Sequence, residues 1–165
     1  FHYAVMYEAY QNNNWPLSGT PESISLLYPA IGLFVLIISS VTCEFAHKAM
    51  TQGKRGLCKD WMIITMALGL FFLAIQGFEY GIFISNGFTP ATNTFGTAFY
   101  VITGFHGFHV MTGLIMLMIV YARLEIGHYH KNRHFSMMAA SWYWHLVDVV
   151  WIVVFTTVYC FWNLH

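Results

Sequence analysis

The sequence predicts an all-α membrane protein: a transmembrane helical bundle of four spans, with both termini on the electropositive side of the bilayer. Three observations lead to this fold class. The 165 residues are 58% hydrophobic and 8% charged, whereas a soluble domain carries roughly 25% charged residues. Four apolar runs are long enough to cross the hydrocarbon core of a membrane. All seven Lys and Arg fall on one side of these runs.

The composition also excludes several classes of protein. Seven basic and seven acidic residues cannot cover the surface of a soluble enzyme of this size, and the apolar content excludes disorder. The formal net charge is zero, so no basic surface would attract nucleic acid. The three cysteines lack CxxC spacing, which argues against a disulfide framework or a zinc site.

The apolar runs follow one another along most of the chain. None alternates with period two, and a bilayer requires backbone hydrogen bonds to be satisfied within each segment, so each run is expected to be helical. The predicted spans are Leu26–Ala46, Trp61–Ile84, Phe95–Leu124 and Met137–Phe161.

The remaining segments are short links and an N-terminal stretch. Lys48–Asp60, Ser85–Thr94 and Glu125–Ser136 join the spans, and links this short favour antiparallel neighbours. Residues 1–25 are expected to hold the end of a preceding helix, Phe1–Tyr10, and a polar loop. Residues 26–165 form the four-helix transmembrane domain.

Basic residues orient the predicted bundle. The N-terminal segment, the second link and the C-terminus carry no Lys or Arg. By the positive-inside rule, the first and third links therefore face the cytoplasm or, in an organelle, the matrix. The residues that give this orientation are Lys48, Lys54, Arg55, Lys59, Arg123, Lys131 and Arg133.

Ionisable residues at membrane depth are costly and are candidates for function. A structural role in joining helices is the alternative interpretation. The residues are Glu79, His106, His109, His145 and Asp148. We expect Asp148 to be buried in protein, where His109, a Trp indole or a backbone group could satisfy it. Small residues allow close helix packing: Gly77 and Gly81 in a GxxxG pattern, and Thr103, Gly107 and Gly113 on the third span.

The histidines do not form a recognisable haem or metal site. His109 and His145 would differ in depth by roughly 10 Å at 1.5 Å per residue, which is too much for two axial ligands of one iron. His106 and His109 share a helix face, but no third ligand at matching depth is evident. We therefore expect no catalytic residue and no metal in this chain.

Six features of the chain together carry a resemblance to a known family. They are TGFHGFHVMTG at Thr103–Gly113, AASWYWHLVDVVW at Ala139–Trp151, QGFEY at Gln76–Tyr80, EFAHKAM at Glu44–Met50, Arg123, and HYHKNRHF at His128–Phe135. In this combination they resemble subunit III of cytochrome c oxidase, and the resemblance covers about Leu26 to the C-terminus. The family usually has seven transmembrane helices and a lipid-filled cleft, and this chain matches its last four helices.

The resemblance implies a non-catalytic core subunit of a terminal respiratory oxidase, in which the complex reduces O₂ and pumps protons. Haem and copper would reside in partner subunits. The chain would stabilise catalytic subunit I, contact other subunits, support proton uptake and hold phospholipid. Alternatives are subunit III of a quinol oxidase, a free-standing transporter or a b-type cytochrome, although no transporter-like repeat is visible.

The resemblance also suggests a lipid site and a membrane. Arg123 matches the family's lipid-contacting arginine, and His128 follows it. Independently of the resemblance, a guanidinium at the interface can bind a lipid phosphate through two hydrogen bonds, although ordinary snorkelling is the alternative. We expect the mitochondrial inner membrane, with a bacterial plasma membrane as the alternative.

Overall fold

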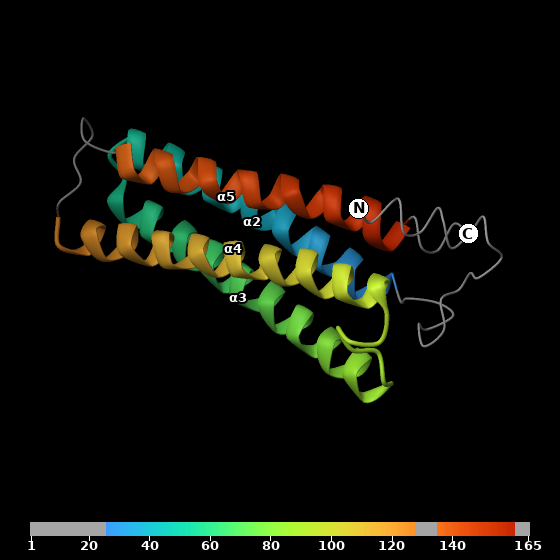
Figure 1. Ribbon diagram of the computed structural model, residues 1–165. Helices are drawn as coiled ribbons and strands as arrows, with labels where there is room; N and C mark the ends of the chain where they lie inside the picture. The colour runs from blue at the N-terminus through green and yellow to red at the C-terminus, as the bar shows by residue number, and fades with distance from the viewer. Residues whose placement is uncertain (1–25, 128–134, 161–165) are drawn as a thin grey trace.

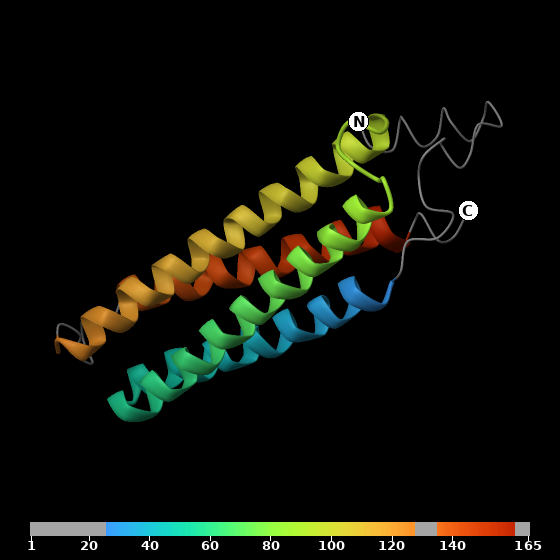
Figure 2. The ribbon, with the colours of Figure 1, turned by 90° about the horizontal axis from the view of Figure 1, so that it is seen from below.

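The computed structural model describes residues 26–127 and 135–160. These residues form α2 (Leu27–Thr51), α3 (Arg55–Ser85), α4 (Thr94–Glu125) and α5 (Phe135–Val154), and a short π-helix η1 (Phe155–Cys160) continues α5. In Figure 1 the long helices α2, α3, α4 and α5 lie beside one another, and successive helices run in opposite directions. The view from below shows the α3–α4 connection at one end of the bundle, opposite the α2–α3 connection (Figure 2).

All four predicted spans are present. Each described helix, with η1 added to α5, is long and apolar enough to cross a membrane. In the described part of the chain no residue is in a β-strand, which confirms the all-α fold class. Helix α2 packs against α3 and α5, and α4 packs against the same two helices, so the four helices close into a ring around a shared core.

The first predicted link is shorter than expected. We predicted a link over Lys48–Asp60, but α2 continues to Thr51 and α3 begins at Arg55, so only residues 52–54 lie outside the helices. Gly53 adopts a φ of 76°, which glycine tolerates without steric cost. Hydropathy marks only the apolar part of a helix, whereas Lys and Arg are good helix formers that extend it into the interface. With 31 residues, α3 is about 46 Å long.

The second predicted link agrees with the structure. Helix α3 ends at Ser85 and α4 begins at Thr94. Asn93 caps α4, because its side-chain oxygen accepts a hydrogen bond of 2.7 Å from the backbone N–H of Gly96, satisfying one of the free donors at the helix start. Gly87 in the connection has a φ of 81°.

Trp144 lies at the centre of the core and is fully buried. A Cβ atom added at Gly69 on α3 would lie 2.6 Å from its Cη2 atom, and one added at Gly113 on α4 would lie 2.9 Å from its Cε3 atom. The indole Nε1 donates a 3.0 Å hydrogen bond to Ser39 Oγ on α2. One side chain of α5 therefore contacts all three other helices.

The predicted GxxxG contact is wrong in the described part of the chain. A Cβ atom added at Gly77 or Gly81 would have no heavy atom of another described residue within 4 Å. Both glycines are exposed on α3. Gly113 does allow close packing, and Gly107 is near Gln76 Oε1, at 3.2 Å from an added Cβ. The spacing alone does not say which face of the helix meets a neighbour.

Candidate functional site

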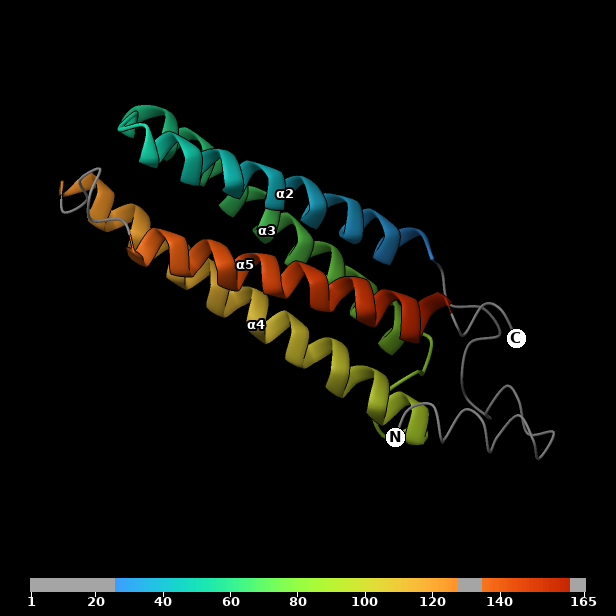
Figure 3. The ribbon, with the colours of Figure 1, turned by 90° about the horizontal axis from the view of Figure 1, so that it is seen from above.

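Four of the five predicted polar residues lie in two groups of polar side chains within the bundle. The first, named here the inner cluster, comprises Gln76, Glu79, Thr103, His106 and Tyr159. The second, named the α2–α5 seam, comprises Ser40, Glu44, Ser141, His145 and Asp148. The inner cluster lies between α3, α4 and the end of α5, whereas the seam lies where α2 and α5 run side by side (Figure 3). The sequence assigned the five candidate residues to three helices, but it could not show which of them lie together in the folded bundle.

Glu79 is almost completely buried, with 3% of its surface exposed. Its Oε2 atom accepts a 3.1 Å hydrogen bond from the Tyr159 hydroxyl. Its Oε1 atom has no hydrogen-bond partner among the described residues. Tyr159 belongs to the π-helix η1, and sequence analysis did not single it out because a tyrosine near the end of a span usually indicates the membrane interface.

Gln76 holds α3 against α4 one turn away from Glu79. Its Nε2 atom donates a 2.8 Å hydrogen bond to the Thr103 carbonyl. The Tyr80 hydroxyl lies 2.6 Å from Thr103 Oγ1, which itself donates to the Phe99 carbonyl at 2.7 Å. Gln76 is three positions before Glu79 and therefore shares its helix face. This spacing is the sequence signal from which Gln76 could have been identified.

His106 is enclosed by aromatic rings. Its ring stacks on Trp151 with centroids 4.7 Å apart and meets the edge of Phe72 at 5.6 Å. Neither of its ring nitrogens has a hydrogen-bond partner in the described part of the chain, and the same holds for Trp151 Nε1. Only 3% of His106 is exposed.

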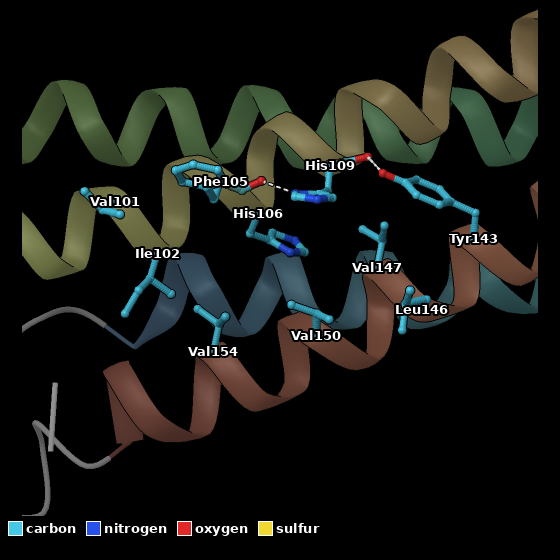
Figure 4. Close-up of a pocket in the computed structure, with 10 residues that line it drawn as sticks. All are labelled: Val101, Ile102, Phe105, His106, His109, Tyr143, Leu146, Val147, Val150 and Val154. Carbon is cyan, nitrogen blue, oxygen red and sulfur yellow. Dashed lines mark hydrogen bonds between the residues drawn. The ribbon is translucent and has the colours of Figure 1, made fainter. Parts of the chain in front are cut away.

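His109 has a different environment from His106, although the two were expected to share a face. It is exposed, and its Nδ1 atom donates to the Phe105 carbonyl at 2.7 Å. A groove of about 400 Å³ lies between α4 and α5. Figure 4 shows Tyr143 reaching from α5 toward His109, with its hydroxyl donating to the His109 carbonyl at 3.3 Å. Side chains three residues apart on a helix point in directions about 60° apart. This difference is enough to bury the His106 imidazole in the bundle and leave the His109 imidazole at the edge of the groove.

Asp148 is buried, with 6% of its surface exposed, as we expected. The hydrogen-bond partners that we suggested for its carboxyl were wrong in the described part of the chain. Neither carboxyl oxygen has a regular hydrogen bond to any described residue, so His109, a Trp indole and the backbone do not satisfy it. Ser40 on α2 lies close to the carboxyl, outside regular hydrogen-bond geometry.

His145 connects α5 to α2 within the seam. Its Nδ1 atom is 2.5 Å from Ser40 Oγ, and its Nε2 atom is 3.3 Å from Ser141 Oγ and 4.0 Å from Glu44 Oε2. In the sequence analysis Glu44 appeared only as the first residue of the EFAHKAM segment. An acidic residue on one helix and a histidine on another cannot be paired from the sequence without knowing which helices are neighbours.

Arg123 lies on the exposed surface of α4 near the basic end of the bundle, defined as the end with the α2–α3 turn. It lines a groove of about 230 Å³ together with Phe135, Ser136 and Ala139 of α5. The neighbouring Glu125 instead pairs with Lys59 at 2.8 Å. His128, the second predicted lipid contact, lies outside the described residues. The lipid-binding role of both residues stays a prediction.

Comparison with known proteins identifies the family. The family model for cytochrome c oxidase subunit III matches residues 1–164, and so includes the N-terminal residues that the resemblance did not cover. Proteins named cytochrome c oxidase subunit 3 are 38% identical over 145 residues in Anopheles gambiae and 42% identical over 146 residues in Synechocystis. A third, from Patiria pectinifera, is 37% identical over 150 residues.

These alignments cover 88% to 91% of this chain but only 54% to 61% of the relatives. The chain therefore spans little more than half the length of the curated relatives it matches. The family match and the four membrane-spanning helices agree with each other, and the chain belongs to the cytochrome c oxidase subunit III family.

Proposed function

We propose that this chain is a non-catalytic core subunit, subunit III, of a proton-pumping cytochrome c oxidase. The observation that carries the proposal is the packing of its two signature segments. Residues 103–113 and 139–151 meet through Trp144 and Gly113 and through His106 and Trp151. The segments that resemble the family most closely thus form much of the contact between α4 and α5.

In this proposal the oxidase complex reduces O₂, and this chain carries no catalytic group of its own. Haem and copper belong to partner subunits. The chain stabilises catalytic subunit I, contacts other subunits and supports proton uptake. Polar side chains at membrane depth make directional contacts between helices, so Glu79, His106, His145 and Asp148 act as intramembrane polar anchors. His109, which is exposed, is the anchor best placed to meet a neighbouring subunit.

The same proposal includes phospholipid at Arg123. Its guanidinium is exposed above a groove whose floor includes Met116, Ile119 and Val120. A planar guanidinium can donate two parallel hydrogen bonds to a phosphate, while the apolar floor suits an acyl chain. His128 is the proposed second contact. No described acidic residue forms an ion pair with Arg123, because Glu125 pairs with Lys59.

The proposed location is the mitochondrial inner membrane, with a bacterial plasma membrane as the alternative. The relatives come from animals and from a cyanobacterium. The basic end of the bundle faces the matrix or cytoplasm in either case, because basic residues favour that side.

Affinity purification of the tagged chain from its native membrane tests the proposal. We expect catalytic oxidase subunits to co-purify and O₂ consumption to be driven by reduced cytochrome c. A reduced-minus-oxidised spectrum with cytochrome c and with a quinol as donors separates the two oxidase types, and a quinol-only response would favour the quinol oxidase. Purification of the chain without any haem-containing partner would overturn the proposal, and a Soret band from the chain alone would indicate a b-type cytochrome.

A further inference from the structure

We propose that the α2–α5 seam is a proton-exchange path that leads from the basic end of the bundle to the buried Asp148 carboxyl. The inference rests on the transmembrane orientation in the proposed function, but it does not require assembly with an oxidase. It assigns to this chain an internal route for protons between the membrane surface and a carboxyl at mid-membrane depth.

Contacts between neighbouring polar side chains define the path. Glu44 is the first member, with Lys48 Nζ 3.4 Å from its Oε1 atom and His47 Nδ1 3.9 Å from its Oε2 atom. The same Oε2 atom is 4.0 Å from His145 Nε2. On the other side of the imidazole, Nδ1 is 2.5 Å from Ser40 Oγ. Asp148 follows His145 by three residues on the same face of α5, and its carboxyl is close to Ser40 but outside regular hydrogen-bond geometry.

The path runs inward from the membrane surface. Glu44 lies seven residues before Thr51 at the basic end of α2, a depth of about 10 Å at 1.5 Å per residue. His145 and Asp148 lie 10 and 13 residues after Phe135 at the same end, at about 15 Å and 20 Å. Side-chain exposure falls along the way, from 41% for Glu44 and 35% for His145 to 6% for Asp148.

Burial without a regular partner points to Asp148 as the inner end of the path. Both of its oxygens lack a hydrogen-bond partner among the described residues. A carboxylate that is left charged and unpaired in an apolar interior is very unfavourable, so such a group takes up a proton. The proton must reach it from water, and the seam supplies the polar atoms between the two.

Imidazole chemistry accounts for the transfer. His145 accepts at Nε2 a proton that Glu44 supplies through one bridging water, since the two atoms are 4.0 Å apart. It releases the proton on Nδ1 to Ser40, whose hydroxyl passes its own proton to Asp148. Each intermediate group gains one proton and loses one, so only Glu44 and Asp148 change their protonation state. The two ring nitrogens of a histidine are suited to such a relay. Ser40 is within hydrogen-bond distance of His145 and close to Asp148, so a change of its side-chain rotamer can bring the hydroxyl into a hydrogen bond with the carboxyl for the last step.

The remaining titratable groups near the seam are few. On α2 they are His47, Lys48 and Cys43, and on α3 Cys58 lies near Cys43. The other buried carboxyl, Glu79, lies toward the opposite end of the bundle and accepts a hydrogen bond from Tyr159. Glu79 therefore provides an internal comparison, because the described residues do not connect this buried carboxyl to the basic end by a chain of polar contacts.

Isotope-edited infrared spectroscopy of the full chain in lipid nanodiscs tests the path. The sequence contains only two aspartates, Asp60 and Asp148, so Asp60→Asn with ¹³C-carboxyl aspartate labels Asp148 alone. Transfer into D₂O shifts the C=O stretch of the protonated carboxyl, and the rate of the shift is the exchange rate. We expect fast exchange in this parent and exchange about tenfold slower or more in His145→Phe, equivalent to a barrier about 1.4 kcal/mol higher.

Matched variants make the result decisive. Glu44→Leu should also slow the exchange if protons enter from the basic end, and His145→Gln should slow it while keeping a polar side chain. His109→Phe removes a histidine on α4, outside the seam, and should leave the rate unchanged. The amide bands of the same spectra report helix content, so a variant that does not fold is recognised.

Three outcomes would overturn the proposal. They are a parent carboxyl that does not exchange, a carboxyl that shows no protonated form at any accessible pH, and equal rates in His145→Phe and His109→Phe. Each would leave Asp148 as a structural anchor. Because oxidase activity is not measured, none of these outcomes bears on whether the chain assembles with an oxidase.

Discussion

Tyr159 and Glu79 show at the residue scale how a buried carboxyl is held in this bundle. The tyrosine hydroxyl donates to the carboxyl over 3.1 Å, and both side chains are inaccessible to lipid. We expect Tyr159→Phe to lower the free energy of unfolding by about 1–3 kcal/mol, because it removes a donor from a buried acceptor. Reversible unfolding in mixed detergent micelles measures the change.

Tyr143→Phe is the control for that prediction. It removes a hydroxyl whose hydrogen bond is longer, at 3.3 Å, and exposed, so its effect should be below about 1 kcal/mol. Equal losses in both variants would contradict a special role for the Tyr159–Glu79 contact.

Arg123 is the residue at which lipid binding can be measured directly. If its guanidinium holds a phosphate bidentately, Arg123→Lys should weaken lipid retention partly and Arg123→Ala more strongly, because Lys keeps the charge without the planar donors. Native mass spectrometry of the purified complex counts the bound lipid. Oxygen-reduction turnover should begin near normal in both variants and then decay faster as lipid is lost.

Arg55→Ala is the matched control, since Arg55 is an exposed arginine at the same end of the bundle outside the Arg123 groove. Lipid retention in Arg123→Ala equal to that of the wild type would leave ordinary snorkelling as the explanation.

At the element scale, glycine positions on α3 differ in what they contact. Gly69 faces Trp144, with only 2.6 Å available to a Cβ atom, whereas Gly77 has open space. We expect Gly69→Ala to destabilise the bundle by about 1–3 kcal/mol through overpacking. Gly77→Ala should be neutral or stabilising by up to about 1 kcal/mol, because alanine is the better helix former. Thermal unfolding of both variants in the same detergent provides the comparison.

Destabilisation of similar size in both variants would show that α3 packs through its Gly77 face as well. That result would indicate that this face is covered by residues outside the described part of the chain or by another subunit.

The element scale also shows what the sequence could predict. Apolar runs located all four spans, because transfer into lipid depends on composition summed over about 20 residues. The predicted helix ends were less accurate. Residues Arg55–Asp60 are helical, but their charges kept them out of the apolar run from which the span was predicted. The pairing of His145 with Ser40 and Glu44 could not be predicted from the sequence, because it depends on which helix faces pack together. The same reason explains why His106 is buried while His109 is exposed.

For the whole molecule, the orientation in the membrane is the main untested prediction. Probing Cys58 with a thiol reagent would not test it, because that side chain is fully buried. Lys54 and Asn86 are exposed at opposite ends of α3. In a Cys160→Ser background, Lys54→Cys should react with an impermeant reagent only from the matrix or cytoplasmic side, and Asn86→Cys only from the other side. The reverse pattern would contradict the positive-inside assignment.

The position of Trp144 has a consequence for biogenesis. A nascent chain emerges from its N-terminal end, so α2, α3 and α4 enter the membrane before α5. Until α5 arrives, the slot beside Gly69 and Gly113 has no indole to fill it, and Ser39 Oγ lacks its donor from Trp144. The three earlier helices are thus left with an incomplete core, and α5, which follows them in the chain, is the helix that completes it. Truncation before α5 should therefore produce a protein that quality-control proteases recognise, even though α2, α3 and α4 are intact.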